Sequence, residues 1–151
     1  MRTPLKTTLA ILLLTATLSA QQEIGLWRAA GSTAKAITGD IALSAQKLTI
    51  NFLAFTIVRV RDLDKTETPA AFDTETNPNG AGSLYRLNVP AATKFLHKNT
   101  LCGTDDTQWM ATYATPHSLQ IAFFSGPKPP TFTQDAISNS SDLCGTYSYA
   151  R

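Results

Sequence analysis

Apolar and polar residues alternate with a period of two along most of this chain, and this pattern is the strongest constraint on its fold. Apart from one short segment, no stretch of eleven or more residues has the apolar spacing of a helix. Alternation places successive side chains on opposite faces of a strand, so we expect an all-β chain. The expected strands cover residues 24–30, 35–44, 47–53, 55–63, 84–89, 107–113, 118–124 and 143–150, with one short helix at 91–98.

Eight strands in one small domain fit two architectures, an up-and-down barrel and a two-sheet sandwich. The connections between residues 34 and 63 are short, and these strands read as consecutive antiparallel neighbours. A closed barrel also removes exposed sheet edges. The sequence therefore favours a single antiparallel eight-stranded barrel, with the sandwich as the alternative. Residues 132–142 are polar, and we expect them to stay outside the sheet.

The N-terminal residues have the pattern of a secretory signal peptide. Arg2 and Lys6 precede the apolar run 9–18, and the small residues Ser19 and Ala20 follow it. The apolar run is shorter than the roughly 20 residues that a membrane-spanning helix needs. We expect residues 1–20 to be removed, leaving residues 21–151 as one soluble exported domain without a membrane span. A short anchor that stays attached is the alternative.

The charge balance excludes one class of partner. The whole chain has 13 Lys and Arg against 11 Asp and Glu, but two of these cations belong to the expected leader. The remaining domain is therefore balanced. A nucleic-acid-binding domain needs a clustered surplus of Lys and Arg, so we expect no nucleic-acid partner.

The chain has two cysteines, Cys102 and Cys144. In an exported protein an even number of cysteines favours a disulfide. A redox-active thiol or a metal site is the alternative, but neither cysteine has a Cys-x-x-Cys partner or a nearby cation. We therefore expect a Cys102–Cys144 disulfide.

Residues 64–83 differ in composition from the rest of the domain. They are rich in Thr, Glu, Asp, Asn, Pro and Gly, with few apolar residues to bury. We expect a long mobile loop here. A loop of this length inside a compact domain is either a binding element or a disordered surface segment.

Gly25, Leu26 and Trp27 resemble the Gly-x-Trp opening of lipocalins and their calycin relatives. This resemblance implies an eight-stranded barrel with Trp27 closing one end, and a binding or inhibitory role. The segments 36–41, 101–103 and 123–126 resemble those of small uncharacterised exported bacterial proteins. That resemblance implies a bacterial protein in the periplasm or secreted from the cell.

Four residues are candidates for ligand binding. Arg59 and Arg61 share one face of an expected strand, and guanidinium groups bind carboxylates and phosphates through paired hydrogen bonds. If Val58 and Val60 face the core, the two arginines are instead solvated surface residues. Trp109 and Tyr113 belong to an aromatic-rich C-terminal half and form either a binding surface or part of the core.

The sequence does not support an enzyme. His97 and His117 fall at a helix end and in a turn, and Ser118 is adjacent to His117 on an alternating strand, where their side chains point apart. No metal-ligand spacing and no cofactor motif is present. We expect a non-catalytic binding or inhibitor-type barrel with an unknown small ligand or an extracellular or periplasmic protein partner. The alternative is a cell-envelope interaction module acting through residues 64–83.

Overall fold

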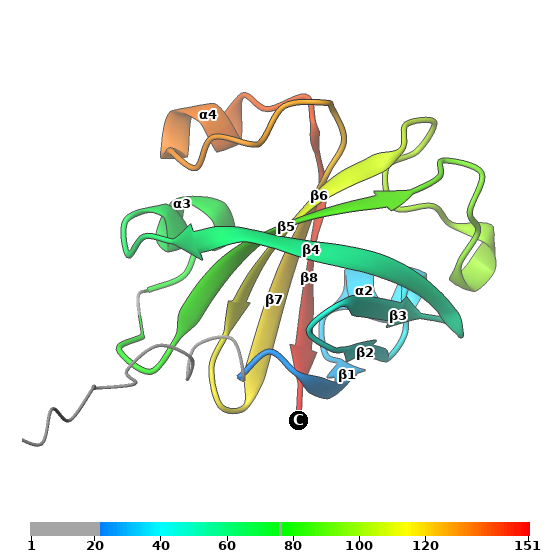
Figure 1. Ribbon diagram of the computed structural model, residues 1–151, viewed down its shortest axis with the longest axis horizontal. Coiled ribbons are helices and arrows are strands. Elements are labelled where there is room, and N and C mark those ends of the chain that lie inside the picture. The colour runs from blue at the N-terminus through cyan, green and yellow to red at the C-terminus, as the bar shows by residue number, and fades with distance from the viewer. Residues whose placement is uncertain (1–21, 76) are drawn as a thin grey trace, which may run out of the picture.

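The computed structural model describes residues 22–75 and 77–151, and the expected leader 1–20 lies outside them. Its eight strands form a closed barrel in which each strand pairs antiparallel with the next, and β8 pairs with β1 (Figure 1). The all-β barrel is thus confirmed over the sandwich. The strands are β1 (Gly25–Ala29), β2 (Ile41–Leu43), β3 (Lys47–Ile50), β4 (Leu53–Leu63), β5 (Ala81–Val89), β6 (Thr107–Ala114), β7 (Ser118–Phe124) and β8 (Leu143–Ala150). None of the helices in the described ranges has the length and hydropathy to cross a bilayer.

Side chains fill the interior of the barrel. Inward-facing apolar residues from all eight strands form one buried cluster, which includes Trp27 on β1, Met110 on β6 and Tyr147 on β8. These three side chains are fully or almost fully buried. Contact among so many buried apolar groups is the main favourable term in folding a domain of this size.

A second apolar cluster lies on the outer surface of the barrel. Trp109, Tyr113 and Phe124 face outward from β6 and β7, and they pack with Phe72 of α3 (Glu67–Phe72) and with Phe132, which precedes α4 (Gln134–Ser138). In Figure 1 these two helices lie on the opposite side of the barrel from β1, β2 and β3. The sheet is therefore buried on both faces in this region, which explains why β6 is almost entirely apolar or small.

Two segments that were expected to lie outside the strands contribute to this outer cluster. The expected loop 64–83 contains α3 and the start of β5, and Ala71 and Phe72 are buried. The polar segment 132–142 contains α4, and Phe132 is buried. The expectation that 64–83 buries little was wrong because a short helix aligns its few apolar residues on the face that meets the barrel.

The expected strand 35–44 was also wrong in its first half. Residues Ser32–Ile37 form helix α2, and only Ile41–Leu43 is a strand. Gly39 has a φ of +62°, which ends the helix with a turn that favours glycine. The hydroxyl of Thr38 lies 2.7 Å from the hydroxyl of Tyr149, which fixes this turn against β8. The alternation of Ile37, Gly39 and Ile41 thus continued across a helix end by coincidence.

The helix expected at 91–98 is reduced to a 3-10 turn, η1 (Leu96–Lys98). Phe95 is extended, and His97 and Lys98 both have positive φ, so no α-helix continues through this segment. The strand expected at 47–53 ends at Ile50, and Asn51 and Phe52 form the turn to β4.

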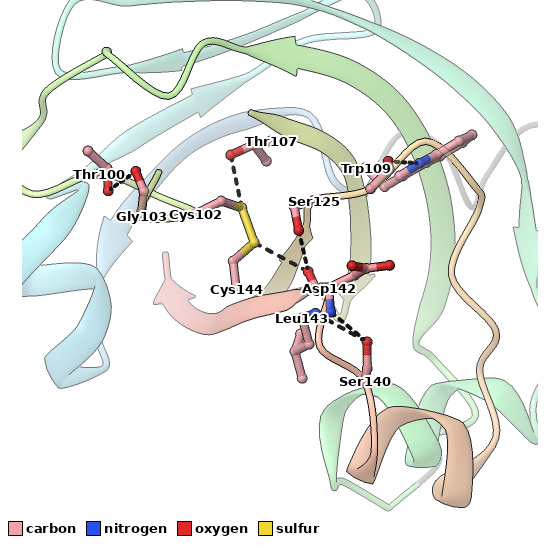
Figure 2. Close-up of a disulfide and its surroundings, with 11 residues drawn as sticks. Thr100, Cys102, Gly103, Thr107, Trp109, Ser125, Ser140, Asp142, Leu143 and Cys144 are labelled. Atoms are coloured by element: carbon pink, nitrogen blue, oxygen red, sulfur yellow. Dashed lines mark hydrogen bonds between the residues drawn. A yellow bond between two sulfur atoms is a disulfide. The ribbon is translucent and has the colours of Figure 1, made fainter. Parts of the chain in front are cut away.

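The expected disulfide between Cys102 and Cys144 is present, with Cα atoms 4.9 Å apart. It joins the segment before β6 to the start of β8, and the Thr107 hydroxyl donates a hydrogen bond to the Cys102 sulfur over 3.2 Å (Figure 2). Beside it, Ser140 Oγ accepts hydrogen bonds from the amides of Asp142 and Leu143, so the turn into β8 is fixed by side chains as well as by the disulfide.

We expect the double variant C102A/C144A to lower the free energy of unfolding by on the order of 4 kcal/mol, because the disulfide closes a long loop in the unfolded chain. The two cysteines are separated by 42 positions. Urea unfolding followed by tryptophan fluorescence measures the difference. Reduction of the wild-type protein serves as the control and should give a similar loss. A double variant as stable as the oxidised wild type would contradict this account of β8.

Candidate functional site

A β-bulge in β4 separates the two arginines that were expected to share a face. Arg59 lies opposite Tyr85 and Arg61 lies opposite Leu84, with the register shifted between them. Because Tyr85 belongs to the interior cluster and Leu84 to the outer one, Arg59 faces the inner side and Arg61 the outer side. The expected shared face was wrong, since the extra residue at the bulge changes the face of every side chain after it.

Arg61 connects the barrel to the two outer helices. Its guanidinium forms a two-pronged ion pair with Glu67 on α3, with N–O distances of 2.8 and 2.9 Å. It also lies 5.8 Å from the ring centroid of Phe132. The hydrogen bonds from Arg61 lower the pKa of Glu67 below its ordinary value. Arg61 therefore stabilises the packing of α3 and the segment before α4 on the sheet.

Trp109 and Tyr113 are both in the outer cluster. The Arg86 guanidinium covers the ring of Trp109 at 4.7 Å, and the Trp109 indole N–H donates to the carbonyl of Gly126. Tyr113 stacks on Phe72 and accepts a hydrogen bond from the backbone N–H of Asn77. Arg59 faces the inner side of the barrel, so the structure does not bring the four expected binding residues together into one site.

One end of the barrel holds a buried carboxylate that the sequence did not reveal as special. The Glu23 side chain is fully buried and accepts hydrogen bonds from the hydroxyls of Ser83, Tyr85 and Thr112. Burial raises the pKa of Glu23, and these three donors and the charge of Arg59 oppose the rise. The alternation pattern gave no signal for this site, because Glu23 precedes the first strand.

The two ends of the described chain meet beside Trp27. The Trp27 indole N–H donates to the Glu23 carbonyl over 2.8 Å, and the Arg151 guanidinium lies 4.1 Å from the Trp27 ring centroid. Arg151 also donates to the carbonyls of Gln22, Ile24 and Pro116. Both ends of the described chain are thus tied to the turn between β6 and β7.

A groove of about 700 Å³ lies on the outer face of β1, β2 and β3. Leu26, Ala42 and Thr49 are register partners across these three strands and line it. Ala42 and Thr49 are small, so the strands leave a hollow beside the Leu26 side chain, which is 79% exposed. We call this hollow the β1–β3 groove.

Phe52 forms one wall of the β1–β3 groove and is 98% exposed. With Asn51 it makes a two-residue turn between β3 and β4, and both residues have positive φ, 47° for Asn51 and 66° for Phe52. Turns of this type favour glycine at the second position, and a bulky side chain there costs free energy. The turn therefore presents an aromatic ring to solvent in an unfavourable backbone conformation.

A second strained segment adjoins the same groove. Leu96 lines it, and the next two residues, His97 and Lys98, also have positive φ. Within the described residues, four of the five non-glycine residues with positive φ thus lie in the two segments beside the groove. Backbone strain of this kind is concentrated at functional sites, which makes the β1–β3 groove the best candidate site.

The groove combines an apolar surface with two cations, of which Arg151 is used in hydrogen bonds to backbone carbonyls and Arg28 is available. Arg28 and Asp40 line its polar end, and the Asp40 carboxylate accepts a hydrogen bond from the Ala29 backbone N–H. Arg28 forms no ion pair within the described part of the chain. A group of three His, Cys, Asp or Glu side chains placed to hold a metal is not found among the described residues. The groove is thus suited to contact an apolar side chain and an adjacent anionic group.

We expect F52G to raise the free energy of unfolding by about 1 kcal/mol, since glycine adopts positive φ without steric cost and the exposed ring contributes little burial. Val58 supplies the matched control, because it is exposed on a strand where glycine is unfavourable. V58G should therefore be less stable than wild type. Urea unfolding of both variants gives the comparison, and a destabilised F52G would show that the ring has packing contacts that hold the turn.

We also expect Glu23 to make stability fall as pH rises. Its pKa in the unfolded chain is near the ordinary 4.5, and burial raises its pKa in the folded protein. Between these values the folded state binds more protons, so increasing pH favours unfolding. The difference in unfolding free energy between wild type and E23Q, measured from below pH 4.5 to neutrality, should fall as pH increases. A difference in unfolding free energy that does not change with pH would mean that the pKa of Glu23 is the same in the folded and unfolded states.

Comparisons of the chain with protein-family models, with curated proteins and with solved structures find no match.

Proposed function

We propose that this chain is an exported, non-catalytic binding protein that holds a segment of another protein in the β1–β3 groove, in the manner of an inhibitor. The observation that carries the proposal is Phe52, an almost fully exposed aromatic side chain on a strained turn beside the β1–β3 groove. Exposed aromatic residues next to a hollow are typical centres of protein–protein contact.

A protein segment fits the groove better than a small molecule fits the barrel. The inward side chains of all eight strands form one buried cluster, so a ligand in the lumen would have to displace them. The groove is open on the outer surface, with exposed Leu26 and Phe52 as apolar contacts. An extended segment laid across β1, β2 and β3 would cover both side chains at once.

Arg28 defines the chemistry of the partner. Since it forms no ion pair within the described part of the chain, it is available to bind a carboxylate on the occupant. The preferred segment therefore carries an aromatic or branched aliphatic residue close to an Asp or Glu. The earlier alternative, an interaction module acting through residues 64–83, is less favoured because α3 and Phe72 in that segment are used to cover the barrel.

The proposal includes the localisation of the protein. The Cys102–Cys144 disulfide is typical of proteins that fold outside the reducing cytosol. The leader pattern at residues 1–20 and the lipocalin-like Gly25-Leu26-Trp27 opening both support an exported binding role. We place the protein in the bacterial periplasm or outside the cell.

A displayed random-peptide library selected on the disulfide-bonded protein tests this function. We expect enriched peptides that combine an apolar residue with Asp or Glu. Their affinity, measured by surface plasmon resonance, should fall at least about tenfold in F52G and in R28A, because each variant removes a central contact. V58S is the matched control and should bind as wild type does.

Three results would overturn the proposal. They are a selection without enrichment, peptides that bind F52G as tightly as wild type, and a dimer that F52G dissociates. The last result, seen by light scattering on a sizing column, would make a second copy of this chain the occupant of the groove.

A further inference from the structure

The three hydroxyls around Glu23 form a pocket built for a carboxylate. Ser83 Oγ and Thr112 Oγ1 each donate to one carboxylate oxygen over 2.8 Å, and Tyr85 donates to the other over 2.6 Å. The side chains of all three donors are almost fully buried. Because strands β5 and β6 supply them, their positions are fixed by the barrel and do not depend on the segment that carries Glu23.

A cation reaches the same pocket from its edge. Arg59 Nη2 donates to Ser83 Oγ over 3.3 Å, and Ser83 in turn donates to Glu23. The Arg59 side chain is 33% exposed and also pairs with Asp62, so it extends from the pocket towards solvent. Its positive charge and the aligned hydroxyl donors favour an anion in the pocket, and they oppose the cost of burial that raises the pKa of Glu23.

The segment that supplies the carboxylate is less firmly built than the pocket. Residues 22–24 precede β1 and form no strand. The segment is attached through carbonyl groups, which accept hydrogen bonds from Trp27 and Arg151. The side-chain oxygen of Gln22 is buried without a hydrogen-bond partner, which is unfavourable. Seating of this segment therefore depends strongly on the Glu23 carboxylate itself.

We propose that the pocket formed by Ser83, Tyr85, Thr112 and Arg59 is a carboxylate-binding site, occupied in this chain by Glu23 as an intramolecular ligand. A free short-chain monocarboxylate is the ligand that replaces it. This site is separate from the β1–β3 groove and does not depend on the function proposed for that groove.

The geometry predicts which carboxylate fits each variant. Replacing Glu23 with Ala removes the terminal methylene and carboxylate, a fragment with the heavy atoms of acetate. Replacing it with Gly removes one carbon more, a fragment with the heavy atoms of propionate. Each variant should therefore prefer the acid that restores the missing atoms.

Thermal unfolding of E23A and E23G at neutral pH provides the test. Both variants should melt below wild type. Sodium acetate should raise the Tm of E23A more than sodium propionate does. For E23G, propionate should raise the Tm more than acetate does. Both effects should saturate as the concentration of the acid increases. Sodium chloride and acetamide are the controls for ionic strength and for shape without charge. E23Q, which keeps the pocket filled, should show no such rise, and adding T112V to E23A should weaken the effect of acetate.

The wild-type protein tests replacement itself. A tethered group has an effective concentration on the order of millimolar, so a free acid must exceed this to compete. Propionate above that concentration should accelerate solvent exchange of the Trp27 indole proton, which donates to the Glu23 carbonyl, more than chloride does.

Two outcomes would overturn the proposal. The first is a rise in the Tm of E23A and E23G in carboxylate that is no larger than the rise in chloride. If either variant does not fold, its refolding yield in carboxylate is compared with its yield in chloride, and equal yields overturn the proposal in the same way. The second is rescue of the variants with no change in Trp27 exchange in wild type, which would make Glu23 a fixed structural residue. F52G should respond to carboxylates as wild type does.

Discussion

The β-bulge between Arg59 and Arg61 is the feature on which the rest of the structure depends. Before it, Ile57 and Arg59 face the inside of the barrel; after it, Arg61 and Leu63 face the outer helices. One inserted residue thus allows a single long strand to serve both apolar clusters. It also places Arg59 beside the Glu23 pocket, where it contacts Ser83 and pairs with Asp62, while Arg61 pairs with Glu67.

The sequence predicted the parts of the fold that depend on local pattern. Strands β6 and β7 and the disulfide were expected from alternation and cysteine count, and the structure confirms them. The prediction of a strand at 35–44 was wrong because α2 ends in a turn held by Tyr149, more than a hundred positions away. The prediction of a long loop at 64–83 was wrong because a short helix needs only a few apolar side chains when a sheet is available to cover them.

The candidate site was less predictable for similar reasons. Alternation placed Phe52 in the strand with Leu48 and Ile50, since a two-residue turn preserves the period of the pattern. The Asn51–Phe52 pair was the available signal, because Asn is common in such turns and Phe is not. The Glu23 pocket left no local signal, because its donors come from two strands at least 60 positions further along the chain.

Strand β1 connects the two candidate sites physically. Its Leu26 lines the outer groove, and the next residue, Trp27, faces inward and donates to the Glu23 carbonyl. Neighbouring side chains on a strand point to opposite faces but move with one backbone. The rest of the barrel holds β1 by three pairs to β2 and two to β8. A ligand that releases Glu23 therefore removes the contact that positions Trp27, and with it part of what holds Leu26 in the groove.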